Sequence, residues 1–213
     1  EAAGEGPDIQ YMWGGTQAME DVWKGNVAPI SDYISEEELS VIPKSALAQT
    51  NWNGKQWGIP AYGFTYGIAY DKEAMRTAGV DPENPFTTWD EFLECCEKLK
   101  SSGITPLGMG LKDGYLPAWI GIFLGQQNMD SVNDMISLMS GQESFTDKKY
   151  SEWLEKIAEL KEAGYINEDI LSLDLYQGQQ LIESKKAAMT LHTQPYAVSL
   201  EKSLGSDQIG FAK

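Results

Sequence analysis

Histidine and cysteine are scarce in this 213-residue sequence. With a single histidine, His192, a histidine-based metal cluster or a Ser-His-Asp triad is nearly excluded. The two cysteines, Cys95 and Cys96, are adjacent on a predicted helix, where a bond between them would be strained, and they form no CxxC motif. We therefore expect one buried thiol and one partly exposed thiol, with no metal ion, no cofactor and no catalytic residue.

Basic residues are also few. The sequence has 16 Lys and Arg against 32 Asp and Glu, which gives a net charge of −16. Such a surface repels phosphate backbones and anionic lipids, so binding to nucleic acid or to a membrane surface is disfavoured. No apolar run approaches the length that spans a membrane, and no signal-peptide pattern is present. These features fit either a cytosolic protein or the mature part of an exported one.

What the sequence does contain is apolar and aromatic material. The hydrophobic fraction is 42%, with seven Trp and ten Tyr, which supports a folded core and excludes general disorder. Predicted strands alternate with predicted helices, a pattern typical of an α/β protein. The predicted strands include Ile9–Met12 and Tyr62–Tyr70, and the stretches "ITPLGMG" and "QIGFAK". The predicted helices include Gln17–Lys24, Lys72–Ala78, Ala118–Leu124, Asp130–Ser140 and Lys148–Ala163, with a further helix starting near Pro195.

Two local signals are especially clear. Asn53-Gly54 between aromatic-rich runs predicts a tight hairpin. The stretch "TTWDEFLECCEKLKSSG" predicts an amphipathic helix that begins with a capping box of Thr88 and Glu91 and ends before Gly103. Its predicted apolar face consists of Trp89, Phe92, Cys96 and Leu99.

Aromatic residues recur where predicted strands pass into loops. They are Trp13, Tyr62, Phe64, Tyr115, Trp119 and Tyr196. In open α/β sheets, ligands bind beyond the carboxyl ends of the strands. Aromatic faces there suit a ligand with apolar C–H faces and polar edges, as a sugar ring has. The nearby polar residues Lys112, Asp113, Gln177 and Gln180 are candidates to bond such edges.

The alternative interpretation is that these rings belong to the core, since aromatic residues are mostly buried on average. We expect that role for Trp89, Phe92 and Trp153, which lie on the apolar stripes of predicted helices, and for Trp23, Trp52 and Trp57. The loop residues differ from these because they recur at strand-to-loop transitions.

Several stretches together resemble the extracellular solute-binding proteins of bacterial ABC importers, in their maltose-binding-protein-like sugar-binding group. They are "PDIQYMWGG", "VAPISDYI", "NGKQWGIPAYGFTYGIAYDKEAM", "TTWDEFLECCEKLKSSGITPLGMG", "KIAELKEAGYIN" and "IESKKAAMTL". They occur in the family's order and span nearly the whole chain. The resemblance implies a type II periplasmic-binding fold, in which two α/β lobes joined by a hinge hold the ligand between them.

The resemblance also implies domain boundaries and site residues. Residues 1–64 would form part of the first lobe, and residues 65–213 would form the second lobe, ending near the return hinge crossing. In the family, the turn after "PD" supplies a stacking aromatic, which here matches Trp13 followed by Gly14. The "KDGY…W" loop, which contributes contacts, matches Asp113, Tyr115 and Trp119.

The sequence departs from the family's pattern in two ways. Where the family places a Gly-Ser/Pro-Trp turn after "AAM", this chain has Thr193-Gln194-Pro195-Tyr196, so Tyr196 is the nearest substitute for the stacking Trp. The family also has a strand, a helix and a strand ahead of "PD" and continues well past "IGFAK". The sequence therefore resembles an internal piece with an incomplete first lobe. From this we expect an exposed sheet edge and self-association.

Three functions follow as hypotheses. The first, implied by the resemblance, is an extracellular or periplasmic protein, anchored as a lipoprotein, that binds an oligosaccharide and delivers it to an ABC transporter permease without chemistry. The second is a glycan-acting enzyme that uses a pair of carboxylates. The third is a solute sensor or adaptor with the same fold. The scarcity of histidine and of nucleophile motifs favours a binding protein over an enzyme.

Overall fold

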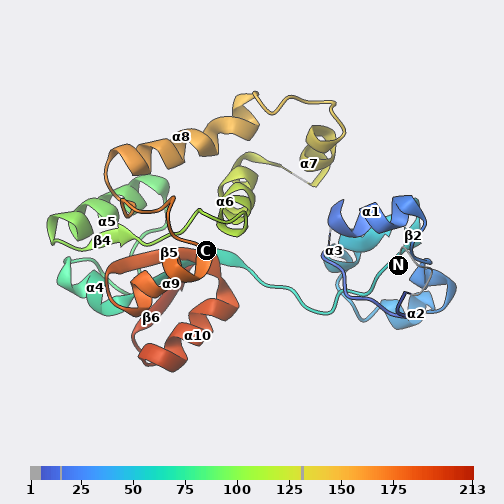
Figure 1. Cartoon of the computed structure of the whole chain (residues 1–213), viewed down its shortest axis with the longest axis horizontal. Coiled ribbons are helices and arrows are strands. Elements are labelled where there is room, and N and C mark those ends of the chain that lie inside the picture. Colours follow the sequence, from blue (N-terminus) through green and yellow to red (C-terminus); the bar gives the residue numbers. More distant parts are fainter. Residues whose placement is uncertain (1–5, 15, 131) are drawn as a thin grey trace. The chain divides into compact units, whose positions relative to one another are not determined.

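A computed structural model describes residues 6–14, 16–130 and 132–213 of the chain. The chain divides into two compact units, Glu1–Gly63 and Phe64–Lys213, which we call unit 1 and unit 2 (Figure 1). That these units correspond to the first and second lobes of a binding protein stays a prediction.

Unit 2 is built on a mixed sheet of four strands in the order β4-β5-β3-β6. The strands are β3 (Tyr66–Asp71), β4 (Thr105–Leu107), β5 (Ala187–Thr193) and β6 (Ile209–Ala212). β3 pairs antiparallel with β5 and with β6, whereas β4 and β5 are parallel. Because β3 and β5 run in opposite directions, the start of β3 lies beside the end of β5, with Tyr66 opposite Thr193.

Helices cover both faces of this sheet (Figure 1). The helices of unit 2 are α4 (Lys72–Thr77), α5 (Trp89–Ser101), α6 (Tyr115–Gly125), α7 (Val132–Met139), α8 (Lys148–Glu162), α9 (Leu175–Glu183) and α10 (Gln194–Leu204), with a short 3-10 turn, η3 (Gln126–Asn128), after α6. The larger core cluster joins one face of the sheet to α4, α5, α6 and α8. A smaller cluster joins the other face to α9 and α10. The predicted α/β character is thus confirmed, with the sheet between two layers of helices.

The helix α5 shows how the sequence specifies these elements. Its capping box forms as predicted: the Thr88 hydroxyl accepts from the Glu91 N–H, and the Glu91 carboxylate accepts from the Thr88 N–H. The buried residues of α5 are Phe92, Cys95, Cys96 and Leu99, spaced as one helical face. The prediction that one thiol is partly exposed is wrong, because both cysteines lie within this face and both are buried and free.

Two other glycine-containing features fix local geometry. In the predicted hairpin, β1 (Asn51–Trp52) and β2 (Lys55–Gln56) are joined by Asn53 and Gly54, both with positive φ. In α9, a Cβ at Gly178 would lie 2.7 Å from the carbonyl carbon of Met109. Glycine therefore permits α9 to pack directly on the backbone of the loop after β4.

Unit 1 consists of short elements. They are α1 (Thr16–Lys24), η1 (Ile30–Asp32), α2 (Glu36–Leu39), α3 (Lys44–Leu47), η2 (Ala48–Thr50) and the hairpin β1–β2. Gln56 is buried, and its side-chain amide donates to the carbonyl oxygens of Leu47 and Gly58 at 3.1 and 2.8 Å. These bonds hold the hairpin against the turn before it. The apolar cluster of unit 1 is small and centres on Val22.

Two predicted strands are corrected by the structure. Residues 9–12 form no strand, because no described segment pairs with them, and Ile9 is 92% exposed and so gains nothing from packing. The strand predicted from Tyr62 begins only at Tyr66, where pairing with β5 starts. Within the described ranges, no helix combines the length and the hydropathy that crossing a lipid bilayer requires.

Candidate functional site

Five rings line up in unit 2 where the start of β3 meets the end of β5. We call them the aromatic row: Phe64, Tyr66, Trp119, His192 and Tyr196. From first to last, neighbouring ring centroids are 5.4, 5.7, 5.0 and 4.0 Å apart. These spacings are typical of direct aromatic contact. The row therefore joins residues that are up to 132 positions apart, from Phe64 to Tyr196, into one surface.

Different elements hold the members of the row. Tyr66 is the first residue of β3, opposite Thr193, and His192 is the last but one of β5, opposite Gly67. The two side chains therefore extend from opposite faces of the sheet, and the Trp119 ring contacts both. Trp119 comes from α6 and Tyr196 from the first turn of α10. Tyr66, Trp119 and Tyr196 are half-buried, so packing covers part of each ring and leaves part open to solvent. Burial raises the pKa of both Tyr66 and Tyr196, which keeps their hydroxyls neutral at physiological pH.

His192 is the buried member of the row, with 6% of its surface exposed. The Thr193 N–H donates to its Nδ1 at 2.8 Å, and the side-chain amide of Gln179 on α9 faces its Nε2. Burial lowers the pKa of His192 to about 4, so the ring is neutral near pH 7. Sequence reasoning used this residue only to exclude metal and triad chemistry. Its position beside the Thr193-Gln194-Pro195-Tyr196 turn is the signal that could have placed it near the site.

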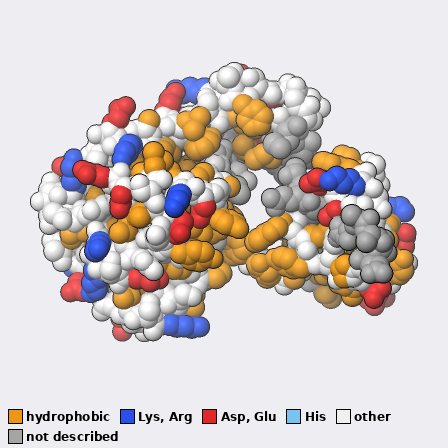
Figure 2. Space-filling view, viewed as in Figure 1, with side chains coloured by type: hydrophobic (Ala, Val, Ile, Leu, Met, Phe, Trp, Pro, Cys, Tyr) orange, Lys and Arg blue, Asp and Glu red, His pale blue; other side chains and the backbone are white. Residues whose placement is uncertain are grey.

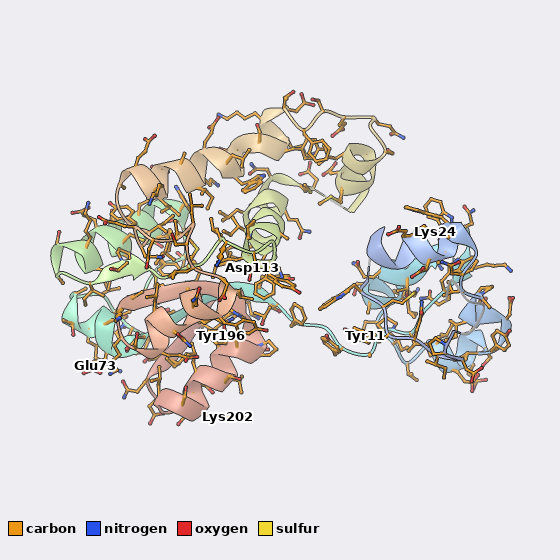
Figure 3. All side chains as sticks on the ribbon, viewed as in Figure 1. Tyr11, Lys24, Glu73, Asp113, Tyr196 and Lys202 are labelled. Atoms are coloured by element: carbon orange, nitrogen blue, oxygen red, sulfur yellow. The ribbon has the colours of Figure 1, made fainter. Side chains whose placement is uncertain are left out.

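Tyr115 is the first residue of α6, and Asp113 lies just ahead of it (Figure 3 labels Asp113). The Asp113 carboxylate accepts from the Leu175 N–H at 3.1 Å and from the Tyr115 N–H at 3.4 Å. It thus bridges the N-termini of α9 and α6, where a negative charge is favourable. Tyr115 is 59% exposed. Of the other polar candidates, Gln177 is engaged in the capping box of α9, where its side chain accepts from the Asp174 N–H at 3.0 Å.

The predicted start of this helix near Ala118 is wrong, because α6 begins at Tyr115. Tyr115 therefore lies in the helix, together with Trp119, and not in the loop before it. Pro117 falls in the first turn, where a missing N–H removes no hydrogen bond, and Asp113 satisfies the Tyr115 N–H. Tyr115 and Trp119 are four residues apart on this helix and therefore share a face.

In unit 1, a second aromatic group forms around Tyr11 (Figure 3). The Tyr11 and Tyr62 rings are stacked at 6.4 Å with their hydroxyls 2.7 Å apart, and the Trp13 ring meets Tyr11 edge-on at 6.0 Å. All three rings are more than half exposed. Sequence reasoning missed Tyr11 as a site residue because it was assigned to a strand. A Cβ at Gly14 would meet only Gln49 at 3.7 Å, so no steric demand explains this glycine.

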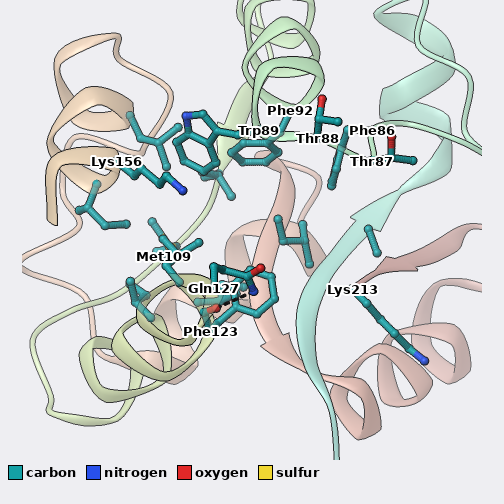
Figure 4. Close-up of a pocket in the computed structure, with 18 residues that line it drawn as sticks. Phe86, Thr87, Thr88, Trp89, Phe92, Met109, Phe123, Gln127, Lys156 and Lys213 are labelled. Atoms are coloured by element: carbon teal, nitrogen blue, oxygen red, sulfur yellow. Dashed lines mark hydrogen bonds between the residues drawn. The ribbon is translucent and has the colours of Figure 1, made fainter. Parts of the chain in front are cut away.

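A separate cavity of about 360 Å³ lies on the face of the sheet that α5, α6 and α8 cover (Figure 4). Its lining is mostly apolar, with Phe92, Met109 and Phe123 among its residues. The ammonium group of Lys156 lies 5.3 Å from the centre of the Trp89 ring. None of the residues predicted for the site lines this cavity.

The sequence of residues 1–211 matches the family described as bacterial extracellular solute-binding protein. The chain belongs to this family. An uncharacterised ABC transporter extracellular-binding protein of Pyrococcus horikoshii is 24% identical over 89% of this chain and 42% of its own length. The sn-glycerol-3-phosphate-binding periplasmic protein of Shigella flexneri is 31% identical over 45% of this chain and 22% of its own length.

Solved structures show the same fold. A chitin oligosaccharide binding protein superposes with a TM-score of 0.83 and 27% identity, covering 100% of this chain and 53% of that one. A protein from work on xylan utilisation by Caldanaerobius polysaccharolyticus gives a TM-score of 0.81 at 22% identity, over 99% of this chain and 54% of that one. The predicted periplasmic-binding-protein-like fold is confirmed. This solute-binding protein spans about half the length of these relatives.

In the part of the chain that the structure describes, this solute-binding protein has neither a metal-binding cluster nor a reactive thiol. Among the described residues, no group of three or more His, Cys, Asp or Glu side chains is arranged to hold a metal ion. Burial raises the pKa of the Cys95 thiol to about 11 and also raises that of Cys96, so neither is a thiolate near pH 7. What the arrangement offers is neutral aromatic surface in each unit.

Proposed function

We propose that this solute-binding protein binds an oligosaccharide and delivers it, chemically unchanged, to the permease of an ABC importer. The aromatic row is the observation that carries the proposal. Its exposed ring faces suit the C–H faces of a pyranose ring. Gln180 on α9, a polar candidate from the sequence, is exposed and can bond sugar hydroxyls. The structural relative that binds chitin oligosaccharide supports the same ligand class.

A phosphorylated ligand is less well matched, although one relative binds sn-glycerol 3-phosphate. Arginine is the side chain best suited to grip a phosphate, and the sequence has only one, Arg76. Arg76 lies on α4, which follows β3 and so lies beyond the end of that strand opposite Tyr66. The net charge of −16 further opposes a dianion. Neutral sugar is therefore the preferred ligand.

We propose the remaining features of the protein on the same family grounds. It would act outside the cell or in the periplasm, with a lipid anchor in its full-length form, and the permease would be its partner. Trp13, Gly14 and Tyr62 of unit 1 and Phe64, Asp113, Tyr115, Trp119 and Tyr196 of unit 2 would contact the ligand. Catalysis is not part of the proposal, and relatives of known role are named as binding proteins.

Calorimetric titration tests the ligand class. The protein is titrated with chitin oligosaccharide, xylo-oligosaccharide, galactose and sn-glycerol 3-phosphate, and NMR follows each sugar for new anomeric signals. We expect heat of binding with a neutral sugar, little with the phosphate, and no new signal. Preferential binding of the phosphate, or appearance of a hydrolysis product, would refute the proposal.

A matched pair of variants tests the site. Trp13 and Trp23 are both 57% exposed and both lie in unit 1, but only Trp13 belongs to the proposed site. We expect Trp13→Ala to weaken sugar binding about tenfold, the effect of losing roughly one stacking contact, and Trp23→Ala to leave it unchanged. Equal effects of the two substitutions would show that Trp13 has no special role.

A further inference from the structure

His192 connects the two rings of the row that come from helices. Its ring meets Trp119 of α6 edge-on, at 5.0 Å and 76°, and lies over Tyr196 of α10 at 4.0 Å and 34°. No short stretch of chain joins α6 to α10. The angle between the Trp119 and Tyr196 rings therefore depends on the side chain that packs between them. His192 occupies that position from β5, a strand of the sheet whose residues are all buried.

The His192 ring has little freedom to turn. Its Nδ1 accepts from the Thr193 N–H at 2.8 Å, and its Nε2 faces the amide of Gln179. Because Nδ1 is an acceptor, the neutral ring carries its proton on Nε2, and the Gln179 amide accepts that proton when its oxygen, in place of its nitrogen, faces the ring. The Tyr196 hydroxyl in turn donates to the Gln179 backbone oxygen at 3.3 Å and lies 3.2 Å from the Glu183 carboxylate. His192, Gln179 and Tyr196 thus form a closed set of contacts.

The buried histidine is also poorly placed to touch a ligand itself, with 6% of its surface exposed. We propose that His192 is a positioning residue, which fixes the angle between the Trp119 and Tyr196 rings and so sets their fit to a sugar. This inference rests on the proposed function and names the residue that organises its site. The phenol ring of Tyr196 on α10 lies against His192. Burial lowers the pKa of His192 to about 4 and raises that of Tyr196, so both rings are neutral near pH 7 and the role does not depend on a change of charge.

The first test needs no ligand. Fluorotryptophan-labelled protein gives a fluorine NMR signal for Trp119, assigned by its loss in Trp119→Phe. We expect His192→Asn, which keeps an acceptor for the Thr193 N–H but removes the ring, to shift or broaden that signal. Thr190→Val serves as the control, because Thr190 is buried two residues earlier on β5 and makes no ring contact. An unchanged Trp119 signal in His192→Asn would overturn the inference, whatever the protein binds.

The second test is a double-mutant cycle on the affinity for the sugar that the wild-type protein binds. We expect His192→Asn and Trp119→Phe each to weaken binding about tenfold, and the double variant to be hardly weaker than either one, because both remove the same aligned platform. Thr190→Val should leave the affinity unchanged. Losses that multiply to about a hundredfold would show that His192 does not act through Trp119. Failure of the wild-type protein to bind any sugar would instead overturn the proposed function.

Discussion

Acidification should destabilise this protein mainly through His192, the only histidine in the chain. The pKa of this residue is about 4 in the folded protein, because the ring is buried, against 6.5 for an unperturbed histidine. As the pH falls below about 6.5, the unfolded chain binds a proton that the folded chain does not. Stability is therefore full above that pH, falls as the pH is lowered, and stops falling once the folded state is protonated as well.

The size of the effect follows from these two pKa values. Each pH unit inside the window costs up to about 1.4 kcal/mol for one proton, so the free energy of unfolding should drop by about 2 kcal/mol between roughly pH 7.5 and roughly pH 5. Hydrogen-bonded carboxylates with lowered pKa values, such as Glu91 and Glu97, act in the same direction. Their stabilisation is present above the unfolded carboxyl pKa and is lost only as the pH falls through the carboxyl range, so they matter little in this window.

Urea unfolding followed by far-UV circular dichroism at the two pH values measures the loss. His192→Asn and His192→Phe cannot take up this proton, so their stability should change by only a few tenths of a kcal/mol, whatever their absolute stability. The comparison between wild type and variants removes the shared contribution of the carboxylates. A wild-type loss equal to that of both variants would mean that His192 is not held neutral by burial, and the reasoning would fail.

Three further predictions concern the core of unit 2. Cys95 and Cys96 are buried with raised pKa values, so neither should react with Ellman's reagent in the native protein, and two thiols should appear on denaturation; fast native labelling would contradict the burial. Leu99 is fully buried, so Leu99→Ala should cost about 3 kcal/mol in urea unfolding, and a loss under about 1 kcal/mol would contradict its place in the core. Gly178→Ala should lower the melting temperature, although alanine is the better helix former, because its Cβ would press on the loop backbone. Gly114→Ala, where a Cβ has open space, should leave it almost unchanged.

The sequence predicts best those elements that carry their own boundary signals. The capping box at Thr88 and the Asn53-Gly54 turn both form, because each depends on residues within a few positions of one another. The predicted strand at residues 9–12 fails for the opposite reason. A strand is stabilised by its pairing partners, and extended composition alone does not supply one.

The same difference between local signals and long-range contacts decides which residues of the candidate site are predicted from sequence. Trp119 and Tyr196 are predicted from sequence, and the structure brings both into one row. His192 joins them through the packing of α6, α9 and α10 against the end of β5, which are contacts between segments distant in sequence. No local pattern distinguishes a histidine that organises a site from one that fills a core. The extension of α6 back to Tyr115 is missed similarly, since it depends on Asp113 bridging two helix starts.

The correction at α6 bears on how the site would bind. Loop-borne rings lose conformational freedom when a ligand orders them, and that loss subtracts from affinity. Here Trp119 is held by a helix, Tyr66 by a strand and Tyr196 by the hydrogen bonds of its hydroxyl to α9. The rings of the row are thus ordered before any ligand arrives, so their stacking energy is available for binding. Because Trp119 and Tyr196 both contact His192, we expect the affinity for ligand to depend on His192, a side chain that is itself almost inaccessible to ligand.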